Sequence, residues 1–309
     1  MLKPSKNEIC PSCMEPGIVI GWSGGEDIYL CRKCGLRFLG ESARARSAEY
    51  NNWYEDILDL DQSSVDSFFC DMEGPYNRQI SFLEKITPGR NILDFGCGPG
   101  IFLATAKKRG WAINGVEASR HGILFAKKKL GIELTSDITN YKEETFDVIR
   151  LSHVLEHIPY PRGLLLDLRR LLKHKGILVI TVPNREPLCE MMINTFRGMF
   201  SKKPKLMGDP YPYMHVLGFS VESLSNLIMP LGYKAISIGT VSMGNQTYYP
   251  LFYDGILRKR TLSHFILKES FKYWAPLFVN IFGSVVGKGS WVVAYYRKET
   301  VFQNFGKIT

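Results

Sequence analysis

Between residues 88 and 183, short apolar runs alternate with amphipathic segments. The apolar runs predict strands, and the amphipathic segments predict helices. The strands are expected at 91–95, 112–117, 132–135, 146–151 and 176–182, and the helices near 99–109, 119–130 and 162–173. Two more strand-like runs follow at Tyr233–Val241 and Ser290–Tyr296. Because apolar strands that alternate with helices are typical of a parallel sheet covered on both faces, the pattern indicates an α/β fold.

The first 87 residues have a different pattern. Residues 1–40 contain several prolines, a Gly24-Gly25 turn and short β-prone runs, whereas residues 41–87 look mainly helical. Pro88-Gly89 then interrupts the chain before the first apolar strand. We therefore predict a small N-terminal module at 1–40, a helical connector at 41–87 and an α/β domain at 88–300.

A glycine-rich segment between the first strand and the next helix carries the clearest chemical signal. Gly96, Gly98 and Gly100 alternate with other residues, and glycines let the backbone turn tightly and approach a ligand. In the ordinary dinucleotide fingerprint the third glycine would fall at Ile101 instead. Asp94 precedes the loop, where a carboxylate repels a pyrophosphate but favours a cofactor with a cationic amino group and a sulfonium.

The segment Asp94-x-Gly96-x-Gly98-x-Gly100 resembles motif I of class I methyltransferases, which use S-adenosylmethionine. The resemblance covers roughly residues 75–240, since Phe146–Ile158 and Leu172–Pro183 are similar to the fourth and fifth strands of that family. It implies a seven-stranded, mostly parallel, doubly wound α/β sheet. The two late strand-like runs would then form its antiparallel edge pair.

The same resemblance implies a set of cofactor-binding residues. Glu117 matches the acidic residue that accepts hydrogen bonds from both ribose hydroxyls, and Asp137 matches the position beside the adenine amino group. Ile138 would supply a wall and a backbone donor, and Asp94 with the three glycines completes the set. Asp94 capping a turn and Glu117 ending a strand are the structural alternatives, but their joint spacing favours a cofactor site. Cys97 is expected to be a small filler within the loop.

Four of the seven cysteines form two pairs near the N-terminus, Cys10-x-x-Cys13 and Cys31-x-x-Cys34, seventeen residues apart. Residues 1–9 lack the apolar core of a secretion signal, so we expect a reducing cytoplasm, where such pairs favour metal over disulfide. Two Cys-x-x-Cys knuckles supply the tetrahedral Cys₄ set that structural zinc takes. The module resembles a zinc ribbon; a disulfide pair and an iron site are the alternatives.

Three histidines are candidate catalytic groups. His153 and His157 flank Glu156 in the loop after the fourth strand, one helical turn apart if that loop begins a helix. His215 precedes a segment, Gly218–Leu224, that is similar to one lining acceptor pockets in small-molecule methyltransferases. An imidazole takes a proton from a hydroxyl or amine near neutral pH. The alternative is that these side chains only hold the loop or pair with Glu156.

Charge and the C-terminal aromatic run widen the choice of partners. A formal net charge of +9 attracts anions in general, so nucleic acid, anionic lipid and phosphorylated substrates all fit. The uncharged run 273–287 is too short to span a bilayer and contains Pro276. We expect a helix packed on the sheet there, with a membrane-surface helix at 271–288 as the alternative.

The resemblance of the 152–157 loop and of Phe219-Ser220 to small-molecule enzymes implies a small acceptor. We predict methyl transfer to a hydroxylated acceptor, a saccharide or a cell-surface glycan precursor, by a cytoplasmic enzyme with structural zinc. The first alternative is a ribosomal-RNA methyltransferase, because such enzymes also pair a four-cysteine module with this domain and a basic chain suits a polyanion. The second is a zinc-ribbon binding protein with an inactive methyltransferase domain. The sequence does not indicate the oligomeric state.

Overall fold

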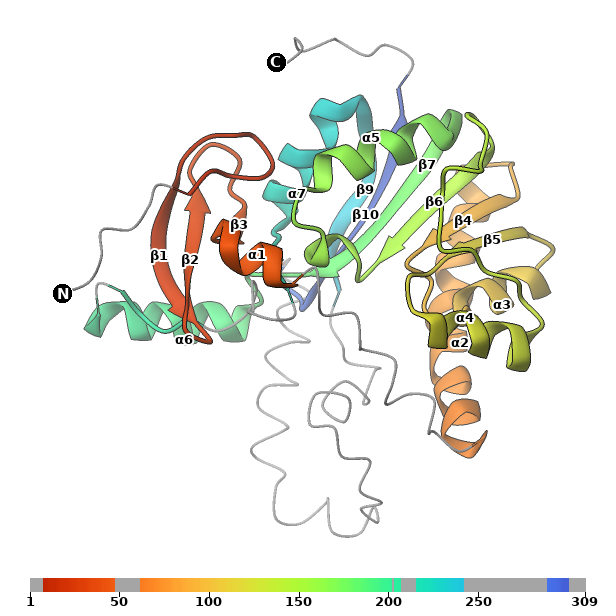
Figure 1. Cartoon of the computed structure of the whole chain (residues 1–309), viewed down its shortest axis with the longest axis horizontal. Helices are drawn as coiled ribbons and strands as arrows, with labels where there is room; N and C mark the ends of the chain where they lie inside the picture. The colour runs from red at the N-terminus through yellow and green to blue at the C-terminus, as the bar shows by residue number, and fades with distance from the viewer. Residues whose placement is uncertain (1–7, 48–61, 202, 207–214, 242–287, 300–309) are drawn as a thin grey trace.

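The computed structural model describes residues 8–47, 62–201, 203–206, 215–241 and 288–299 (Figure 1). Its larger sheet has six strands in the order β5-β4-β6-β7-β10-β9. They are β4 (Asn91–Phe95), β5 (Ala112–Val116), β6 (Phe146–Ser152), β7 (Leu172–Pro183), β9 (Tyr233–Val241) and β10 (Trp291–Lys298). The first four run parallel, and β10 lies antiparallel between β7 and β9. The α/β fold class is thereby confirmed, including the antiparallel edge pair.

Two predicted boundaries differ from the structure. The run 132–135 forms no full strand, because only Thr135 pairs with Val116 beside β5, as an isolated parallel bridge. That bridge occupies the place of the seventh strand. The helix predicted at 162–173 is α5 (Pro161–Leu171), and the next residue, Leu172, already belongs to β7. Phe146 of β6 pairs with Leu172, which extends the sheet four residues before Gly176.

Helices cover both faces of the sheet because successive strand residues point to opposite sides. Val148 in β6 packs in the same cluster as α2 (Gln62–Ile86) and α3 (Ile101–Lys108). The next residue, Ile149, packs in the cluster that contains α5 and α7 (Val221–Ile228). In β7 the same alternation places Ile177 and Val179 in the cluster of α2 and α3, and Leu178 and Ile180 in the cluster of α5 and α7. The sheet is therefore doubly wound.

The remaining helices lie around this core. They are α1 (Glu41–Ser47), α4 (Arg120–Phe125) with the π-helical turn Ala126–Leu130, α6 (Leu188–Phe200), and the 3₁₀ turns Leu155–His157 and Met229–Leu231. Helices α1 and α2 fall within the predicted connector. None of the helices in the described residues is both long and apolar enough to cross a membrane. The predicted helix at 271–288 lies outside the described residues except for Lys288.

A second, smaller sheet is formed by β1 (Gly17–Ser23), β2 (Glu26–Cys31) and β3 (Arg37–Leu39). Gly24 and Gly25 join β1 to β2 with φ of 51° and 88°, and two left-handed residues are what a two-residue type I′ hairpin requires. The fourth strand, β8 (Leu217–Gly218), comes from far along the chain and pairs antiparallel with β3. The N-terminal module therefore shares a sheet with the α/β part, and the boundary predicted at residue 40 remains a prediction.

Candidate functional site

The glycine loop follows β4 and has a backbone conformation that residues with side chains rarely adopt. Gly96, Gly98 and Gly100 have φ of 70°, 56° and 81°. A Cβ added at Gly96 would also lie 2.4 Å from a methyl group of Val154, so a side chain does not fit there. The amides of Gly96 and Cys97 both donate to the carbonyl of Val116 at the end of β5. The loop is thus held open as a bare backbone cradle at the carboxyl end of the parallel strands.

Glu117 closes this cradle from the neighbouring strand. Its Oε2 accepts the Gly98 amide at 2.7 Å, and its Oε1 accepts the Ser119 amide at 2.8 Å. Burial raises the pKa of the carboxyl group, and the amide donors act in the opposite direction. A carboxylate offers about four lone-pair sites, so two amide bonds leave capacity for two hydroxyl donors. The geometry therefore fits the ribose contact predicted for Glu117.

Asp94 lies on the α2 and α3 side of the sheet and already has a cationic partner. Both of its carboxylate oxygens accept from Nη1 of Arg150, at 2.8 and 3.0 Å. Arg150 also donates to Gln79 at 2.9 Å and lies 4.1 Å from the ring centre of Phe102. Burial raises the pKa of Asp94 even though Arg150 opposes that shift. The role of Asp94 toward the cofactor stays a prediction, because this carboxylate is occupied by a protein guanidinium.

Arg150 was not predicted as a functional residue, although one signal was visible. An arginine within the apolar strand Val148-Ile149-Arg150-Leu151 needs a buried partner, since isolated buried charges are very unfavourable. On the adjacent strand, β4, the residue opposite Arg150 in the sheet register is the acidic Asp94.

Asp137 and Ile138 follow the Thr135 bridge at the outer edge of β5. The Glu117 amide donates to the Thr135 carbonyl at 2.9 Å, which holds these two segments side by side. Glu117 follows the end of β5 and Asp137 follows Thr135, so the two predicted acidic residues lie on neighbouring segments. Asp137 is exposed, and the side chain and amide of Thr139 bind its carboxylate and lower its pKa. Ile138 packs partly against the core. Cys97 is buried, which raises the pKa of its thiol and fits the predicted filler role.

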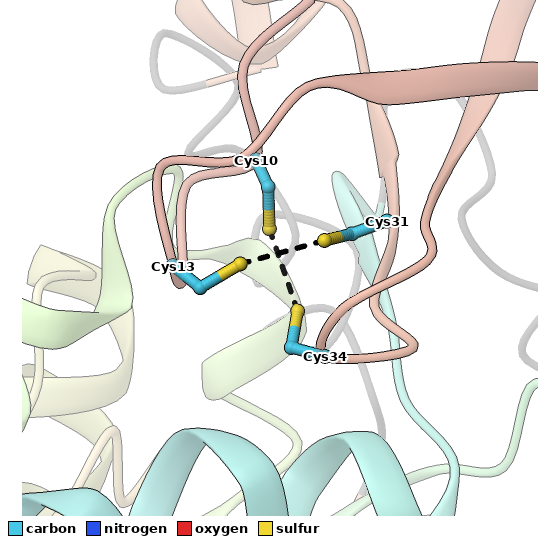
Figure 2. Close-up of side chains that lie close together, drawn as sticks. All are labelled: Cys10, Cys13, Cys31 and Cys34. Carbon is cyan, nitrogen blue, oxygen red and sulfur yellow. Dashed lines mark hydrogen bonds between the residues drawn. The ribbon is translucent and has the colours of Figure 1, made fainter.

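The four cysteines of the N-terminal module converge, as Figure 2 shows. Sγ of Cys10 lies 3.6 Å from that of Cys34, and Sγ of Cys13 lies 3.4 Å from that of Cys31. A tetrahedral zinc with Zn–S bonds of about 2.3 Å has sulfur atoms about 3.8 Å apart, close to these distances. The contact between Cys10 and Cys34 lowers the pKa of Cys34 and raises that of Cys10, so Cys34 is the thiol of this pair that ionises first, and zinc requires thiolates. The donor set fits a structural zinc ion.

Both cysteine pairs have the same backbone geometry. In each pair, the amide four residues after the first cysteine donates back to the carbonyl of that cysteine. The donor is Met14 for Cys10 and Gly35 for Cys31. Met14 and Gly35 have φ of 63° and 76°, respectively. Each knuckle is therefore closed by its own backbone, independently of any metal.

The three candidate histidines lie around a buried carboxylate at the end of β6. Glu156 is fully buried, and its Oε1 lies 3.5 Å from Nδ1 of His153. The rings of His157 and His215 are 4.8 Å apart, whereas the ring of His153 contacts Trp291 at 4.8 Å. His153 and His157 therefore do not share a helical face, because only Leu155–His157 forms a 3₁₀ turn and His153 has a φ of 56°.

Charge couples these residues. Burial acts to raise the pKa of Glu156, but the three neighbouring histidines outweigh it and the pKa is lowered. Neither carboxylate oxygen accepts a hydrogen bond of good geometry. Ligand atoms of Glu156, His157 and His215 lie within 4.8 Å of one another, so this group could also hold a metal ion. The arrangement suits either an imidazole base or a small cation at the end of β6.

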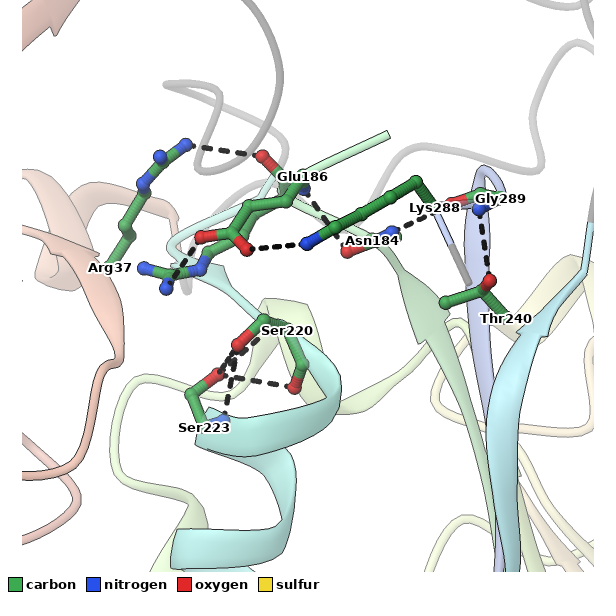
Figure 3. Close-up of polar contacts among 9 residues, drawn as sticks. Arg37, Asn184, Glu186, Ser220, Ser223, Thr240, Lys288 and Gly289 are labelled. Atoms are coloured by element: carbon green, nitrogen blue, oxygen red, sulfur yellow. Dashed lines mark hydrogen bonds and ion pairs between the residues drawn. The ribbon is translucent and has the colours of Figure 1, made fainter. Parts of the chain in front are cut away.

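A polar network surrounds the carboxyl end of β7 (Figure 3). Asn184 donates to the carbonyl of Gly289 at 2.7 Å, which links the end of β7 to the segment before β10. Glu186 pairs with Arg185 at 2.8 Å and with Lys288 at 3.6 Å. Arg37 of the N-terminal module donates to the carbonyl of Arg185 at 3.1 Å. Sequence analysis did not identify this network, because its members come from three distant segments.

Comparison with known proteins places the chain among methyltransferases. A family model described as a methyltransferase domain matches residues 69–237, more than half of the chain. A segment of 120 residues is 32% identical to the mitochondrial ubiquinone biosynthesis O-methyltransferase of Schizosaccharomyces pombe and covers 35% of this chain and 43% of that protein. For the ubiquinone biosynthesis O-methyltransferase of Roseobacter denitrificans, the identity is 26% over 160 residues, 49% of this chain and 64% of that protein. The chain thus spans about half the length of the curated relatives it matches.

Among solved structures, a SAM dependent methyltransferase from Archaeoglobus fulgidus is similar to this chain. It is 18% identical, and the alignment covers 73% of this chain and 94% of that protein with a TM-score of 0.46.

Proposed function

Because the chain belongs to a family of methyltransferase domains, we propose that it transfers a methyl group from S-adenosylmethionine to a hydroxyl group of a small molecule. The observation that carries this proposal is the bare glycine cradle closed by Glu117, whose two amide bonds fix the carboxylate beside the loop. The cofactor supplies a methyl group that is already activated by its sulfonium. The residues of the chain then need to orient the two reactants and exclude water.

At the cofactor, we assign Glu117 to the ribose hydroxyls, and Asp137 with Ile138 to the adenine. The glycine backbone would face the amino acid part, and the positive φ of Gly96, Gly98 and Gly100 is a conformation that residues with a Cβ rarely adopt. Arg150 neutralises Asp94 beneath the loop, so the net negative charge of the proposed site comes from Glu117 and Asp137. NAD is not expected to bind, because the third glycine is misplaced for a pyrophosphate.

At the acceptor, a hydroxyl group has to lose its proton as its oxygen attacks the methyl group. We assign His157 as the first candidate base, with His215 in ring contact and Glu156 buried next to it in the chain. A buried carboxylate stabilises the imidazolium that forms when the base takes the proton. His153 is second, since it contacts Trp291 and Glu156 instead of the His157–His215 pair.

The acceptor itself is a hydroxylated small molecule, and a saccharide is the class that the sequence favours. The names of the curated relatives support a second class, an acceptor of ubiquinone biosynthesis. The RNA alternative is supported by the charge of +9 and by the four-cysteine module, which some ribosomal-RNA methyltransferases also have. An RNA acceptor predicts binding that weakens steeply as salt rises, because counterions are released. A small acceptor predicts no structure-selective RNA binding at physiological ionic strength.

The decisive experiment is methyl transfer from labelled S-adenosylmethionine to a panel of saccharides, phenolic quinone precursors and structured RNA. We expect labelled methyl ether on a small hydroxylated acceptor, and loss of transfer in the His157→Ala variant. Elemental analysis separates the two mechanisms: a histidine base predicts one zinc per chain, at the four cysteines, whereas a metal-bound acceptor at Glu156, His157 and His215 predicts a second metal ion. Transfer to RNA alone would overturn the proposal, and no binding of S-adenosylmethionine would support an inactive domain instead.

A further inference from the structure

The N-terminal module contacts the α/β part through backbone bonds that lead from the cysteine site to the histidines. Cys31 and Cys34 close the second knuckle, and β3 begins at Arg37, three residues after Cys34. Arg37 and Phe38 pair with Gly218 and Leu217 of β8. A strand of two residues has little stability of its own, so β8 depends for its conformation on β3 and, through the Arg185 amide that donates to the Phe219 carbonyl at 2.7 Å, on the end of β7.

Val216 is the point where this pairing reaches the acceptor side. Its carbonyl accepts the Leu39 amide at 3.1 Å, and its amide donates to the Glu156 carbonyl at 2.9 Å. His215 is the residue immediately before Val216, and its ring contacts His157, the residue immediately after Glu156. The two histidines therefore meet because one peptide, at Val216, is held between β3 and the 3₁₀ turn.

Side-chain packing follows the same path. Phe38 and Leu39 of the module are fully buried in the same cluster as Leu217, Phe219 and Leu224 of the α/β part. Two polar bonds add to it, from Arg37 to the Arg185 carbonyl at 3.1 Å and from Asn226 to the Cys34 carbonyl at 3.2 Å. A module of this size lacks a sufficient core of its own, and metal binding commonly supplies the missing folding free energy.

We propose that the cysteine module positions His215 against His157, so that metal at the four cysteines controls acceptor geometry although no cysteine lies in the acceptor site. Arg37 is the positioning residue outside the metal ligands, because it joins β3 to the carboxyl end of β7. The catalytic role of the histidines rests on the proposed function, whereas their positioning does not. The glycine loop bonds to Val116 and Glu117, so cofactor binding should not depend on the module.

Hydrogen exchange of the full chain, loaded with zinc or stripped by a chelator, tests the positioning without any acceptor. We expect stripping to accelerate exchange about tenfold or more in 8–40 and also in 155–158 and 215–220, while 91–100 keeps its protection. Reloading with zinc should restore it. Acceleration confined to 8–40 would overturn the proposal, and so would uniform acceleration of the whole chain, which would indicate global unfolding. This outcome does not depend on whether the proposed reaction is correct.

An Arg37→Met variant tests the same connection with the metal in place. We expect full zinc content and unchanged affinity for S-adenosylmethionine. Turnover should fall about tenfold, the scale of one hydrogen bond from a charged donor, and Arg37→Lys should recover part of it. Lys33→Met is the matched control, because Lys33 lies in the same module but pairs only with exposed Glu15 at 2.6 Å. Equal exchange at 155–158 and 215–220 in Arg37→Met and Lys33→Met would contradict the role of Arg37, even if no acceptor were found.

Discussion

The proposed cofactor side and the proposed acceptor side of this protein are built in different ways. On the cofactor side, the loop after β4 and Glu117 lie within one stretch of chain, and their bonds are mostly local. On the acceptor side, His157, His215, Arg185 and Arg37 come from four distant segments that meet through β3 and β8. A local site keeps its geometry when remote elements are lost, whereas an assembled site does not. The predictions below test whether the two sides separate in this way.

The largest effect is expected from losing a zinc ligand. A Cys13→Ser variant should lose the metal and unfold residues 8–40, because structural zinc contributes on the order of 10 kcal/mol to the folding of such small modules. Elemental analysis and circular dichroism would measure both changes. Cys97→Ser is the matched control, since Cys97 is a buried thiol outside the module and its loss should leave one zinc per chain. Wild-type protein that contains no zinc under reducing conditions, with Cys10 and Cys13 oxidised, would contradict the assignment.

Breaking the Asp94–Arg150 pair should destabilise the cofactor side. An Arg150→Met variant leaves the Asp94 carboxylate buried without its partner, which costs about 3–5 kcal/mol of unfolding free energy. Denaturant unfolding would measure this loss. Adding Asp94→Asn to the same variant should recover much of it, because the uncompensated charge is removed. Equal stability of Arg150→Met and wild type would show that the pair has no structural role.

Removing the proposed base should affect turnover alone. We expect His157→Ala to reduce turnover by about 10²–10⁴-fold, the usual contribution of a positioned general base. Affinity for S-adenosylmethionine should stay the same, since His157 lies on the acceptor side. His174→Ala is the matched control, because His174 is exposed on β7 away from both sites. Near-native turnover in His157→Ala, His153→Ala and His215→Ala would mean that no histidine acts as the base.

A smaller effect is expected from pH. Burial raises the pKa of Glu117. In the proposed site, the charged form is the one that would accept the ribose hydroxyls. Affinity for S-adenosylmethionine should therefore be constant at neutral pH and fall as the pH drops through this raised pKa, at a higher pH than an exposed glutamate would give. The sign is opposite for stability: because protonation is easier in the folded state, the contribution of Glu117 to the free energy of unfolding is lost as the pH rises through the raised pKa and is recovered as the pH drops. A Glu117→Gln variant should show no such decrease in calorimetric titrations, and an identical decrease would assign it to another group.

The difference between the two sides also explains what sequence could predict. The six described strands of the larger sheet, the glycine loop and the four-cysteine cluster follow from local patterns, and the structure contains all three. Arg150 was missed because its partner, Asp94, lies 56 positions earlier on a neighbouring strand. β8 was missed because two residues, Leu217 and Gly218, show no periodicity. Without β8, nothing in the sequence connected the cysteine module to His215.

The central claim is that cofactor binding belongs to the local half of the site. Calorimetry of S-adenosylmethionine binding to wild type, Glu117→Ala and His157→Ala, run side by side, tests it most directly. We predict that Glu117→Ala weakens binding by about 1.5–3 kcal/mol, the scale of lost hydrogen bonds to a charged group, and that His157→Ala leaves it unchanged. Unchanged binding in Glu117→Ala, or equal weakening in both variants, would contradict the account.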